Sequence, residues 1–483
     1  MSSAKVIWLD KEHEMALALG KGQETAAWDK AFIEKHDVAG PRYTSYPTAL
    51  QFHEEFSQED YRLGVQHSNQ SKKPLSVYVH LPFCESLCYY CACNKIVTKS
   101  SQSMRHYLDN LILEIEKRAV DFTDGRPVYQ MHWGGGTPTY YDGPELTELM
   151  YHLGRQFHMV DSNRGEFSIE VDPRSVDTDK LSLLKGLGFN RISLGIQDFD
   201  EDVQKAINRV QPLGQIQELV SDIRALQYGS LNFDLIYGLP AQTPRSVMKT
   251  VEQVIDLSPD RISLFNYAHL PSRFKAQALM DEAALPSSQE KLEILCESSQ
   301  RLIEAGYVYI GMDHFAKPDD ELAVALRREV LHRNFQGYTT YKDADLVGVG
   351  VSSISQIADT YSQNTRSIKE YQALLDDKQL PTKYGVTLTE EDKLRRDIIM
   401  SLICGNHLEI APLEETYKID FKEKFSKELE LMGALTRDGI VEENQTGFHV
   451  TEKGRLVVRR VCMVFDEYLP DHLKNGQRFS RII

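Results

Sequence analysis

The sequence predicts an α/β fold, an incomplete (β/α)6 barrel with an N-terminal segment before it and a mainly helical domain after it. Apolar, strand-like runs alternate with amphipathic, helix-like stretches from residue 75 onward, and this alternation indicates a parallel sheet with right-handed crossovers. Unusual polar, glycine and cysteine residues follow the ends of these runs. Beyond about residue 380 the pattern changes to helices with charged faces.

Six runs carry the strand pattern, in which an apolar stretch alternates between two faces. They are residues 75–81, 128–133, 167–171, 191–196, 233–237 and 262–266. Helical periodicity lies between them at residues 107–119, 145–157, 178–187 and 244–257. The chemistry of such barrels gathers at the C-terminal ends of the strands. We therefore expect functional residues in the segments that follow them, which are 84–95, 134–139, 170–174, 195–198, 234–240 and 266–269.

The chain divides into four predicted parts. Residues 1–27 form a weakly patterned extension, and residues 28–74 form an ordered segment that covers the barrel. The barrel and its continuation occupy residues 75–380, and the mainly helical domain occupies residues 381–483. In that domain Thr389 is the expected N-cap of a helix with an acidic first turn. The tail is expected to contain a hairpin and a helix.

Composition restricts the class of protein. The chain has 483 residues, of which 41% are hydrophobic and 26% charged, as in an ordinary soluble globular protein. We expect a cytoplasmic location and no membrane span, because no secretory signal and no apolar run of membrane-spanning length occur. The net charge of −16 argues against nucleic acid as a partner. An anionic substrate would need local arginine and lysine side chains.

Four of the seven cysteines lie within ten positions, at Cys84, Cys88, Cys91 and Cys93. The first three have the spacing C-x3-C-x2-C, which offers three thiolates to a cubane [4Fe–4S] cluster and leaves one iron open. A zinc knot would need a second cysteine pair farther along the chain, and disulfides so close in sequence would be strained. Cys93 has two open interpretations, a buried thiol or a group beside the substrate or the cluster ligands.

This spacing is the signature of the radical S-adenosylmethionine superfamily, which the loop resembles. In that superfamily the open iron binds S-adenosylmethionine and passes an electron into its sulfonium. The cleavage yields a 5′-deoxyadenosyl radical that abstracts hydrogen from an unactivated carbon. The resemblance implies that the predicted barrel is a radical S-adenosylmethionine barrel.

Several residues near the predicted strand ends have both a functional and a structural interpretation. The triple glycine at residues 134–136 either makes a tight turn or lets a ligand approach the backbone. Glu170 either accepts hydrogen bonds from a ribose or pairs with a barrel cation. Arg209 is either an exposed helix charge or a partner for a carboxylate. Tyr78 and His80 share one strand face, and for His80 we favour core packing.

Five segments together resemble one family, the bacterial oxygen-independent coproporphyrinogen III oxidases. They are residues 40–48, 84–95, 132–139, 234–240 and 265–271, and the similarity runs from about residue 28 to the C-terminus. Two positions depart from the family pattern. Ala92 stands where the family usually has glycine, which affects the backbone approach of the second cofactor, and Tyr90 stands where phenylalanine is common.

The resemblance implies that coproporphyrinogen III loses two propionate carboxyl groups as CO2 and becomes protoporphyrinogen IX. It also implies a [4Fe–4S] cluster on Cys84, Cys88 and Cys91, and two molecules of S-adenosylmethionine. The first molecule, bound on the cluster, would contact Tyr78, Gly135, Glu170 and Ile354. The second would contact Tyr90, Gly136, Thr137, Gln197, Arg209, Asp234 and Ala268.

Cys93 and Tyr78 are the expected catalytic residues, and Arg42 and Arg209 are the candidates for binding substrate carboxylates. We expect a monomer that receives electrons from a donor such as a flavodoxin. Two alternatives from the same superfamily remain: a haem-binding chaperone and a haem-degrading radical enzyme. The chaperones generally lack the fourth cysteine and the segment at residues 42–47, and this chain has both.

Overall fold

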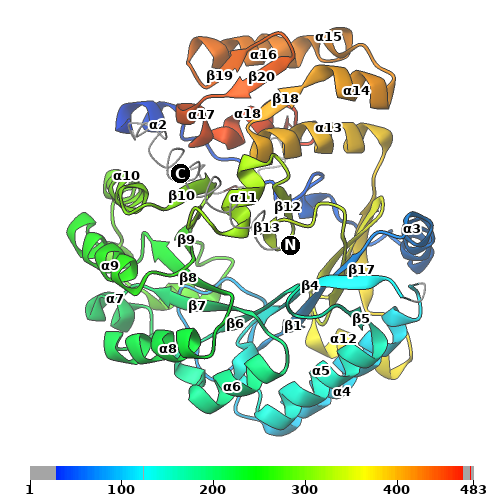
Figure 1. Cartoon of the computed structure of the whole chain (residues 1–483), viewed down its shortest axis with the longest axis vertical. Helices are drawn as coiled ribbons and strands as arrows, with labels where there is room; N and C mark the ends of the chain where they lie inside the picture. The colour runs from blue at the N-terminus through cyan, green and yellow to red at the C-terminus, as the bar shows by residue number, and fades with distance from the viewer. Residues whose placement is uncertain (1–28, 123–124, 471–478, 480–483) are drawn as a thin grey trace, which may run out of the picture.

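The computed structural model describes residues 29–122, 125–470 and 479, and the predicted extension at residues 1–27 lies outside them. Six parallel strands lie side by side in chain order, as predicted (Figure 1). They are β1 (Leu75–Leu81), β4 (Pro127–Gly135), β6 (Glu166–Val171), β7 (Arg191–Gln197), β8 (Ser230–Tyr237) and β9 (Arg261–Asn266). The predicted (β/α)6 order is therefore confirmed.

Helices cover the outside of these strands (Figure 1). The four predicted ones are α4 (Ser101–Ala119), α5 (Gly143–Gln156), α6 (Thr178–Gly186) and α9 (Pro244–Leu257). Sequence analysis missed α7 (Glu201–Ala206) and α8 (Leu213–Ala225), which connect β7 to β8. The N-cap of α8 is Pro212, which makes no side-chain cap hydrogen bond, so the usual start signal of a helix is absent there.

The sheet continues beyond the six strands on both sides, which the sequence pattern did not specify. On one side β14 (Asp345–Val349) pairs in parallel with β1 and is followed by the antiparallel strands β15 (Ile354–Ile357), β16 (Thr360–Asn364) and β17 (Thr382–Thr387). On the other side β9 pairs with β11 (His314–Ala316) and β11 with β10 (Val308–Gly311). Further short strands are β5 (His158–Met159), β12 (His332–Asn334) and β13 (Gly337–Thr339).

Polar side chains fill much of the barrel interior. Alternate residues of a strand share one face, and a cavity of about 300 Å³ inside the barrel is lined by such residues from five of the strands. They include Gln130, His132, Ser168, Glu170, Ser193, Asn232, Asp234 and Ser263. Apolar branched residues usually fill a complete barrel. Here the polar interior leads from the strand ends toward the opposite end of the barrel.

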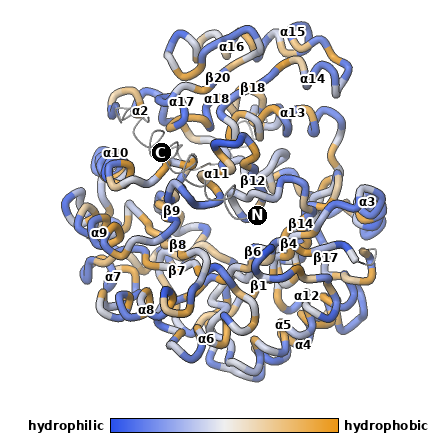
Figure 2. Tube along the Cα trace, in the orientation of Figure 1, coloured by the Kyte–Doolittle hydropathy of each residue, from blue (hydrophilic) through white to orange (hydrophobic). Residues whose placement is uncertain are grey.

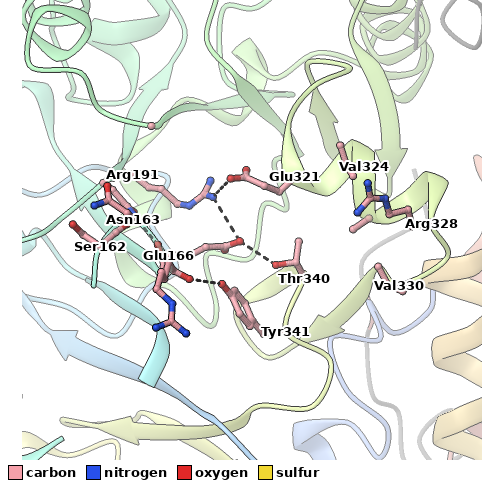
Figure 3. A pocket seen from close by; sticks show the side chains of 15 residues that line it. Ser162, Asn163, Glu166, Arg191, Glu321, Val324, Arg328, Val330, Thr340 and Tyr341 are labelled. Carbon is pink, nitrogen blue, oxygen red and sulfur yellow. Dashed lines mark hydrogen bonds and ion pairs between the residues drawn. The ribbon is translucent and has the colours of Figure 1, made fainter. Parts of the chain in front are cut away.

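That opposite end holds a cluster of paired charges (Figure 3). Arg191 contacts Glu321 at 2.7 Å and Glu166 at 3.6 Å. The Thr340 hydroxyl donates to Glu166 at 3.0 Å. These contacts connect the barrel strands β6 and β7 to the later part of the chain, at α11 (Glu321–Arg327).

The C-terminal part has its own hydrophobic core. Its elements are α13 (Glu390–Met400), β18 (His407–Glu409), α14 (Ile410–Tyr417), α15 (Phe421–Lys424), α16 (Ser426–Arg437), β19 (Val441–Glu443), β20 (Gly447–Val450), α17 (Glu452–Arg455) and α18 (Val458–Val464). Thr389 caps α13 within a capping box, as predicted. The predicted hairpin and following helix are also present.

The N-terminal segment packs against this C-terminal core as well as against the barrel. It contains α2 (Lys30–His36) and α3 (Gln58–Ser71). Between them, Tyr43 and Tyr46 are buried in the C-terminal core, and the Tyr43 hydroxyl donates to Asp466 at 2.8 Å. α3 packs against β15 and β16. The two ends of the described chain therefore stabilise each other.

Hydrophobic and hydrophilic residues alternate along the outer helices (Figure 2), as expected for helices with one buried face. Among the described residues, no helix combines the length and the apolar character needed to cross a membrane.

Glu114 of α4 is a buried link between the barrel and its continuation. Its side chain is 0% exposed. It accepts hydrogen bonds from Arg118 at 2.7 Å, the Gly350 amide at 2.7 Å, Tyr371 at 2.6 Å and Asn364 at 2.8 Å. One carboxylate thus joins α4 to β16, to the loop after β14 and to α12 (Ile368–Asp376).

We expect Glu114→Gln to lower the free energy of unfolding by about 3 kcal/mol, because the change leaves the buried Arg118 cation without its carboxylate. Urea unfolding followed by circular dichroism measures the effect. Glu218→Gln, at an exposed position of α8 without an ion pair in the described structure, is the control and should unfold as the wild type does. Equal stability of the two variants would contradict the role given to Glu114.

Candidate active site

The cysteine loop leaves the C-terminal end of β1 and is closed at its base. β2 (Phe83–Cys84) and β3 (Ile96–Val97) form a short parallel ladder. The Ile96 amide donates to the Pro82 carbonyl at 2.8 Å, and the Thr98 amide donates to the Cys84 carbonyl at 3.2 Å. The residues between β2 and β3 therefore form one loop with closely held ends.

Hydrogen-bond donors and cations surround the first two thiols of this loop. Thr137 donates to the Cys84 sulfur at 3.4 Å, although burial raises the pKa of Cys84 to about 11. Arg209 and Arg174 each place a guanidinium nitrogen 3.6 Å from the Cys88 sulfur. Positive charge and donated hydrogen bonds stabilise thiolates.

Cys91 is the third thiol and has the lowest pKa of the loop cysteines whose shift is resolved. A hydrogen bond from Cys93 and the nearby Lys95 ammonium lower the pKa of Cys91 to about 6, against the opposing effect of burial. Lys95 also donates to the Cys91 carbonyl at 3.0 Å. This donor set suits the anionic thiolate ligands of an iron–sulfur cluster.

Among the described residues, no three His, Cys, Asp or Glu side chains converge closely enough to hold a single metal ion. A cubane cluster binds each thiolate through a different iron, so its ligands lie farther apart than those of one zinc ion.

A cavity of about 250 Å³ opens beside the cysteine loop. It is lined by Cys84, Cys88 and Cys91 and by six of the seven residues expected at the second S-adenosylmethionine: Tyr90, Gly136, Thr137, Gln197, Arg209 and Asp234. The seventh, Ala268, lines a different and larger cavity of about 880 Å³. The structure thus brings together the cluster cysteines and most of this predicted set.

A neighbouring cavity of about 340 Å³ is lined by all four residues expected at the first S-adenosylmethionine, which are Tyr78, Gly135, Glu170 and Ile354. Ile354 begins β15, beyond the six predicted strands. Cys93, Gly135 and Glu170 line both cavities. Cys93 is exposed rather than buried, so the interpretation of Cys93 as a buried thiol is wrong.

Tyr78 and His80 form a bridge from β1 to the cysteine loop. The Tyr78 hydroxyl lies 3.0 Å from Nδ1 of His80, and Nε2 of His80 lies 3.0 Å from the carbonyl oxygen of Asn94. His80 is buried, as the packing interpretation expected, and burial lowers its pKa. It also orients the tyrosine and the loop, a contact that the strand pattern alone did not predict.

Glu170 lies where the two cavities meet. Its carboxylate accepts a hydrogen bond from the Gly135 amide at 3.1 Å and lies 3.2 Å from Nε2 of His132. Burial opposes ionisation, but these contacts lower the pKa of Glu170. Its side chain remains 43% exposed because it faces the cavities. No lysine or arginine pairs with it in the described residues, so an acceptor for donated hydroxyl groups is available.

Close contacts within the chain explain the three glycines at residues 134–136. A methyl group on Gly134 would lie 2.7 Å from the Glu170 carboxylate, and one on Gly136 would lie 2.5 Å from the Pro82 carbonyl oxygen. Gly135 has a φ of +118°, which residues with a side chain rarely adopt, and a methyl group there would lie 2.6 Å from the His80 ring. The groups that lie close to these glycines are therefore Glu170, His80 and the cysteine loop of the chain itself.

Arg209 is buried, so the interpretation as an exposed helix charge is wrong. It pairs with Asp172 at 2.9 Å and donates to the Gly195 carbonyl at 2.8 Å. Its Nε atom is buried without a hydrogen-bond partner. An orphaned guanidinium N–H beside the cavity is suited to a ligand carboxylate. The residues present therefore fit both the cluster and S-adenosylmethionine.

Sequence analysis assigned no role to several residues of this site, although Asp172 and Arg174 lie in the expected segment 170–174. The Asp172 carboxylate lies 2.7 Å from Arg174 and also pairs with Arg209. Through these two arginines it is connected to Cys88. His132 connects Glu170 to Ser168, whose hydroxyl lies 2.6 Å from its Nδ1 atom. The position of Asp172 and Arg174 directly after a predicted strand was the signal that could have found them.

Comparison with known proteins shows the family to which the chain belongs. Residues 78–254 match the model of the Radical SAM superfamily, and residues 388–457 match the HemN C-terminal domain. Oxygen-independent coproporphyrinogen III oxidase of Escherichia coli K12 is 49% identical over 94% of this chain and 98% of its own length. The corresponding Pseudomonas aeruginosa protein is 48% identical over 95% of this chain and all of its own length.

The chain belongs to the oxygen-independent coproporphyrinogen III oxidase family. A solved structure agrees: coproporphyrinogen III oxidase (HemN) from Escherichia coli, described as a Radical SAM enzyme, superposes with a TM-score of 0.87 at 48% identity and covers 91% of this chain and 99% of its own. Radical S-adenosylmethionine enzymes use a [4Fe–4S] cluster and S-adenosylmethionine, so the predicted cofactors are confirmed at the level of the family.

In this family member we expect single replacement of Cys84, Cys88 or Cys91 by serine to abolish cluster binding, because three thiolates hold the cubane. Iron and sulfide analysis after anaerobic reconstitution should give about four irons in the wild type and almost none in the variants. The wild type should also show a broad thiolate-to-iron absorption that dithionite bleaches. Cys296→Ser, at a buried single cysteine, is the control and should retain the iron.

Cys93→Ser should behave differently, because Cys93 faces the two cavities and is not needed as a ligand. The variant should keep its iron and still cleave S-adenosylmethionine, and lose porphyrin turnover. Iron content and 5′-deoxyadenosine formation, measured on one preparation, test this. Loss of iron would show that Cys93 is a ligand.

Proposed function

We propose that this protein carries out the anaerobic oxidative decarboxylation of coproporphyrinogen III to protoporphyrinogen IX in haem biosynthesis. The observation that carries the proposal is the pair of adjoining cavities beside the cysteine loop, whose walls meet at Cys93, Gly135 and Glu170. The cavity lined by Cys84, Cys88 and Cys91 would hold the cluster with S-adenosylmethionine beside it, and the adjoining cavity adds room for a second molecule. The names of the relatives add the substrate.

Each predicted residue set has a physical role in this proposal. Cys84, Cys88 and Cys91 would hold the cluster, which supplies the electron that cleaves S-adenosylmethionine to methionine and a 5′-deoxyadenosyl radical. Ionised Glu170 accepts hydrogen bonds from ribose hydroxyls, since its pKa is lowered. Arg209 offers its unpartnered N–H to a carboxylate.

Asp234 lines the cavity that contains the cluster cysteines. Burial and the nearby Glu170 carboxylate raise the pKa of Asp234. Ser193 donates to one of its oxygens at 2.8 Å and Asn232 donates to the other at 2.9 Å. These bonds fix the orientation of the carboxyl group, so it can present an oxygen to the cavity in one direction.

Tyr78 and Cys93 line the wall between bound cofactor and substrate and are the proposed catalytic residues. Tyr78 is held by His80 at 3.0 Å and stacks on His132, with ring centroids 5.9 Å apart. A rigid aromatic wall limits movement of a bound adenosyl group and excludes water from a reactive carbon radical. Cys93 is exposed and lines the same cavity as Tyr78.

The overall reaction balances without a proton donor. A β-hydrogen of a propionate is removed, the bond between the α-carbon and the carboxyl carbon breaks, and CO2 leaves as a vinyl group forms. One electron then passes to a one-electron acceptor. We propose that a flavodoxin-like protein supplies the reducing electron, and that the protein acts as a monomer in the cytoplasm.

Anaerobic reconstitution followed by turnover of coproporphyrinogen III tests the proposal. Mass spectrometry of the oxidised product should show the loss of two carboxyl groups as CO2 and two vinyl groups, with 5′-deoxyadenosine formed alongside. Stoichiometric haem binding without turnover would favour a haem-binding chaperone. An opened macrocycle would favour a haem-degrading enzyme.

Arg42→Ala should raise the KM for coproporphyrinogen III about tenfold, because a charge-assisted hydrogen bond to a carboxylate is lost. Uncoupled 5′-deoxyadenosine formation should persist, since Arg42 lies outside both cofactor cavities. In the present structure Arg42 pairs with Asp313 at 2.8 Å and lines the largest cavity. Unchanged porphyrin kinetics would make the role of Arg42 structural.

A further inference from the structure

The largest of the described cavities lies outside the two cofactor cavities, and of its lining residues only Arg42 and Ala268 have been given a ligand so far. Its volume is about 880 Å³, within the range of roughly 300–1,000 Å³ that small-molecule sites occupy. Its walls come from α2, from α10 (Ser288–Glu304) and from the C-terminal ends of β8 and β9. A space of this size at the strand ends can hold part of a tetrapyrrole.

This cavity adjoins the cluster cavity across the strand ends. On β8, Asp234 lines the cluster cavity and Tyr237 lines the large one. On β9, Phe265 lines the cluster cavity and the next residue, Asn266, lines the large one. Ala268, expected at the second S-adenosylmethionine, also lines the large cavity. Successive residues of a strand face opposite sides, so the two cavities lie on the two sides of β8 and β9, and a ligand would pass from one to the other around the strand ends, at residues 266–269.

Two polar atoms of this cavity's lining residues are buried without a hydrogen-bond partner. They are Nε of Arg42 and Oδ1 of Asn266. Buried polar groups without partners are rare in native proteins and often mark a bound group or water. The two residues belong to different parts of the chain, so the pattern is not one local defect.

Lys291 is the cation that lacks a carboxylate partner. Among the described residues that line the cavity, Arg42 pairs with Asp313 and Lys30 pairs with Glu293 at 3.8 Å. Lys291 has only the Tyr267 carbonyl within hydrogen-bond reach, at 3.4 Å. Its alkyl chain lies over Gly238, next to Tyr237. Four carboxylates also line the cavity: Asp313 and Glu293, which pair with Arg42 and Lys30, and Glu34 and Asp37 of the N-terminal segment.

We propose that this cavity holds the propionate side chains that the reaction leaves intact, with Lys291 as their principal anchor. The inference rests on the proposed function. Coproporphyrinogen III has four propionates, of which two must reach the cofactors. The other two extend away from the reacting carbons, and burying their charges without a cation would be costly. Lys291 supplies that cation and Nε of Arg42 supplies a further hydrogen-bond donor, while Oδ1 of Asn266 is an acceptor and suits an N–H group of the ligand rather than a carboxylate.

The test compares Lys291→Met, which keeps the length of the side chain and removes its charge, with the wild type. The probe is coproporphyrin III, the oxidised and fluorescent form of the substrate, titrated into the anaerobically reconstituted full-length protein. Lys291→Met should weaken binding about tenfold. The KM for coproporphyrinogen III should rise by a similar factor with little change in kcat, and the iron content should be unchanged.

Three controls make the result specific. Lys249→Met, at an exposed position of α9 without an ion pair in the described structure, should bind the probe as the wild type does. Lys291→Arg should restore most of the affinity because it restores the charge. Coproporphyrin III tetramethyl ester, which has no carboxylates, should bind the wild type and Lys291→Met equally. If Lys291→Met fails to fold, Lys291→Gln replaces it.

Unchanged probe affinity in Lys291→Met, or an equal loss with the tetramethyl ester, would overturn the inference. The first result would show that the charge is not used, and the second that only packing has changed. A wild type that binds the probe through Lys291 but does not convert coproporphyrinogen III would contradict the proposed function and leave the carboxylate site in place.

Discussion

The alternation of the parallel strands is the constraint on which the rest of the structure depends. Apolar residues such as Val77 and Val79 pack outward under the helices, while Tyr78 and His80 on the same strand turn inward. The same alternation on the neighbouring strands places His132, Glu170 and Asp234 around one interior. A barrel built in this way buries its core outside the sheet and keeps its polar groups inside, where they bond to one another and to ligands.

Positively charged side chains surround the cysteine loop, although the molecule as a whole is negatively charged. The chain carries a net charge of −16, yet Arg174, Arg209 and Lys95 surround the thiols. Asp172 pairs with both arginines and holds them in place. Short-range pairs of this kind outweigh a distant surface charge, because solvent screens the distant field over about 10 Å.

A few contacts made by His80 fix the positions of the side chains and the backbone around the site. His80 joins Tyr78 to the loop after Cys93, and Gly135 has no side chain because that ring occupies the space. This arrangement explains the glycines at the end of β4 without invoking a ligand. It also means that the positions of catalytic and cofactor-binding side chains are coupled, since a displaced His80 would move both the tyrosine and the cysteine loop.

The sequence by itself determined the six-strand order, the cysteine loop and the cap at Thr389, because periodicity, residue spacing and capping are local properties. It could not place Ile354 in the same cavity as Tyr78, pair Arg209 with Asp172, or expose Cys93, since these depend on how distant segments pack. Nor could it show that Tyr43 and Tyr46 belong to the C-terminal core. Only the tertiary structure brings together residues so far apart in the chain, because long-range packing decides which polar groups are buried and which partners remain for them.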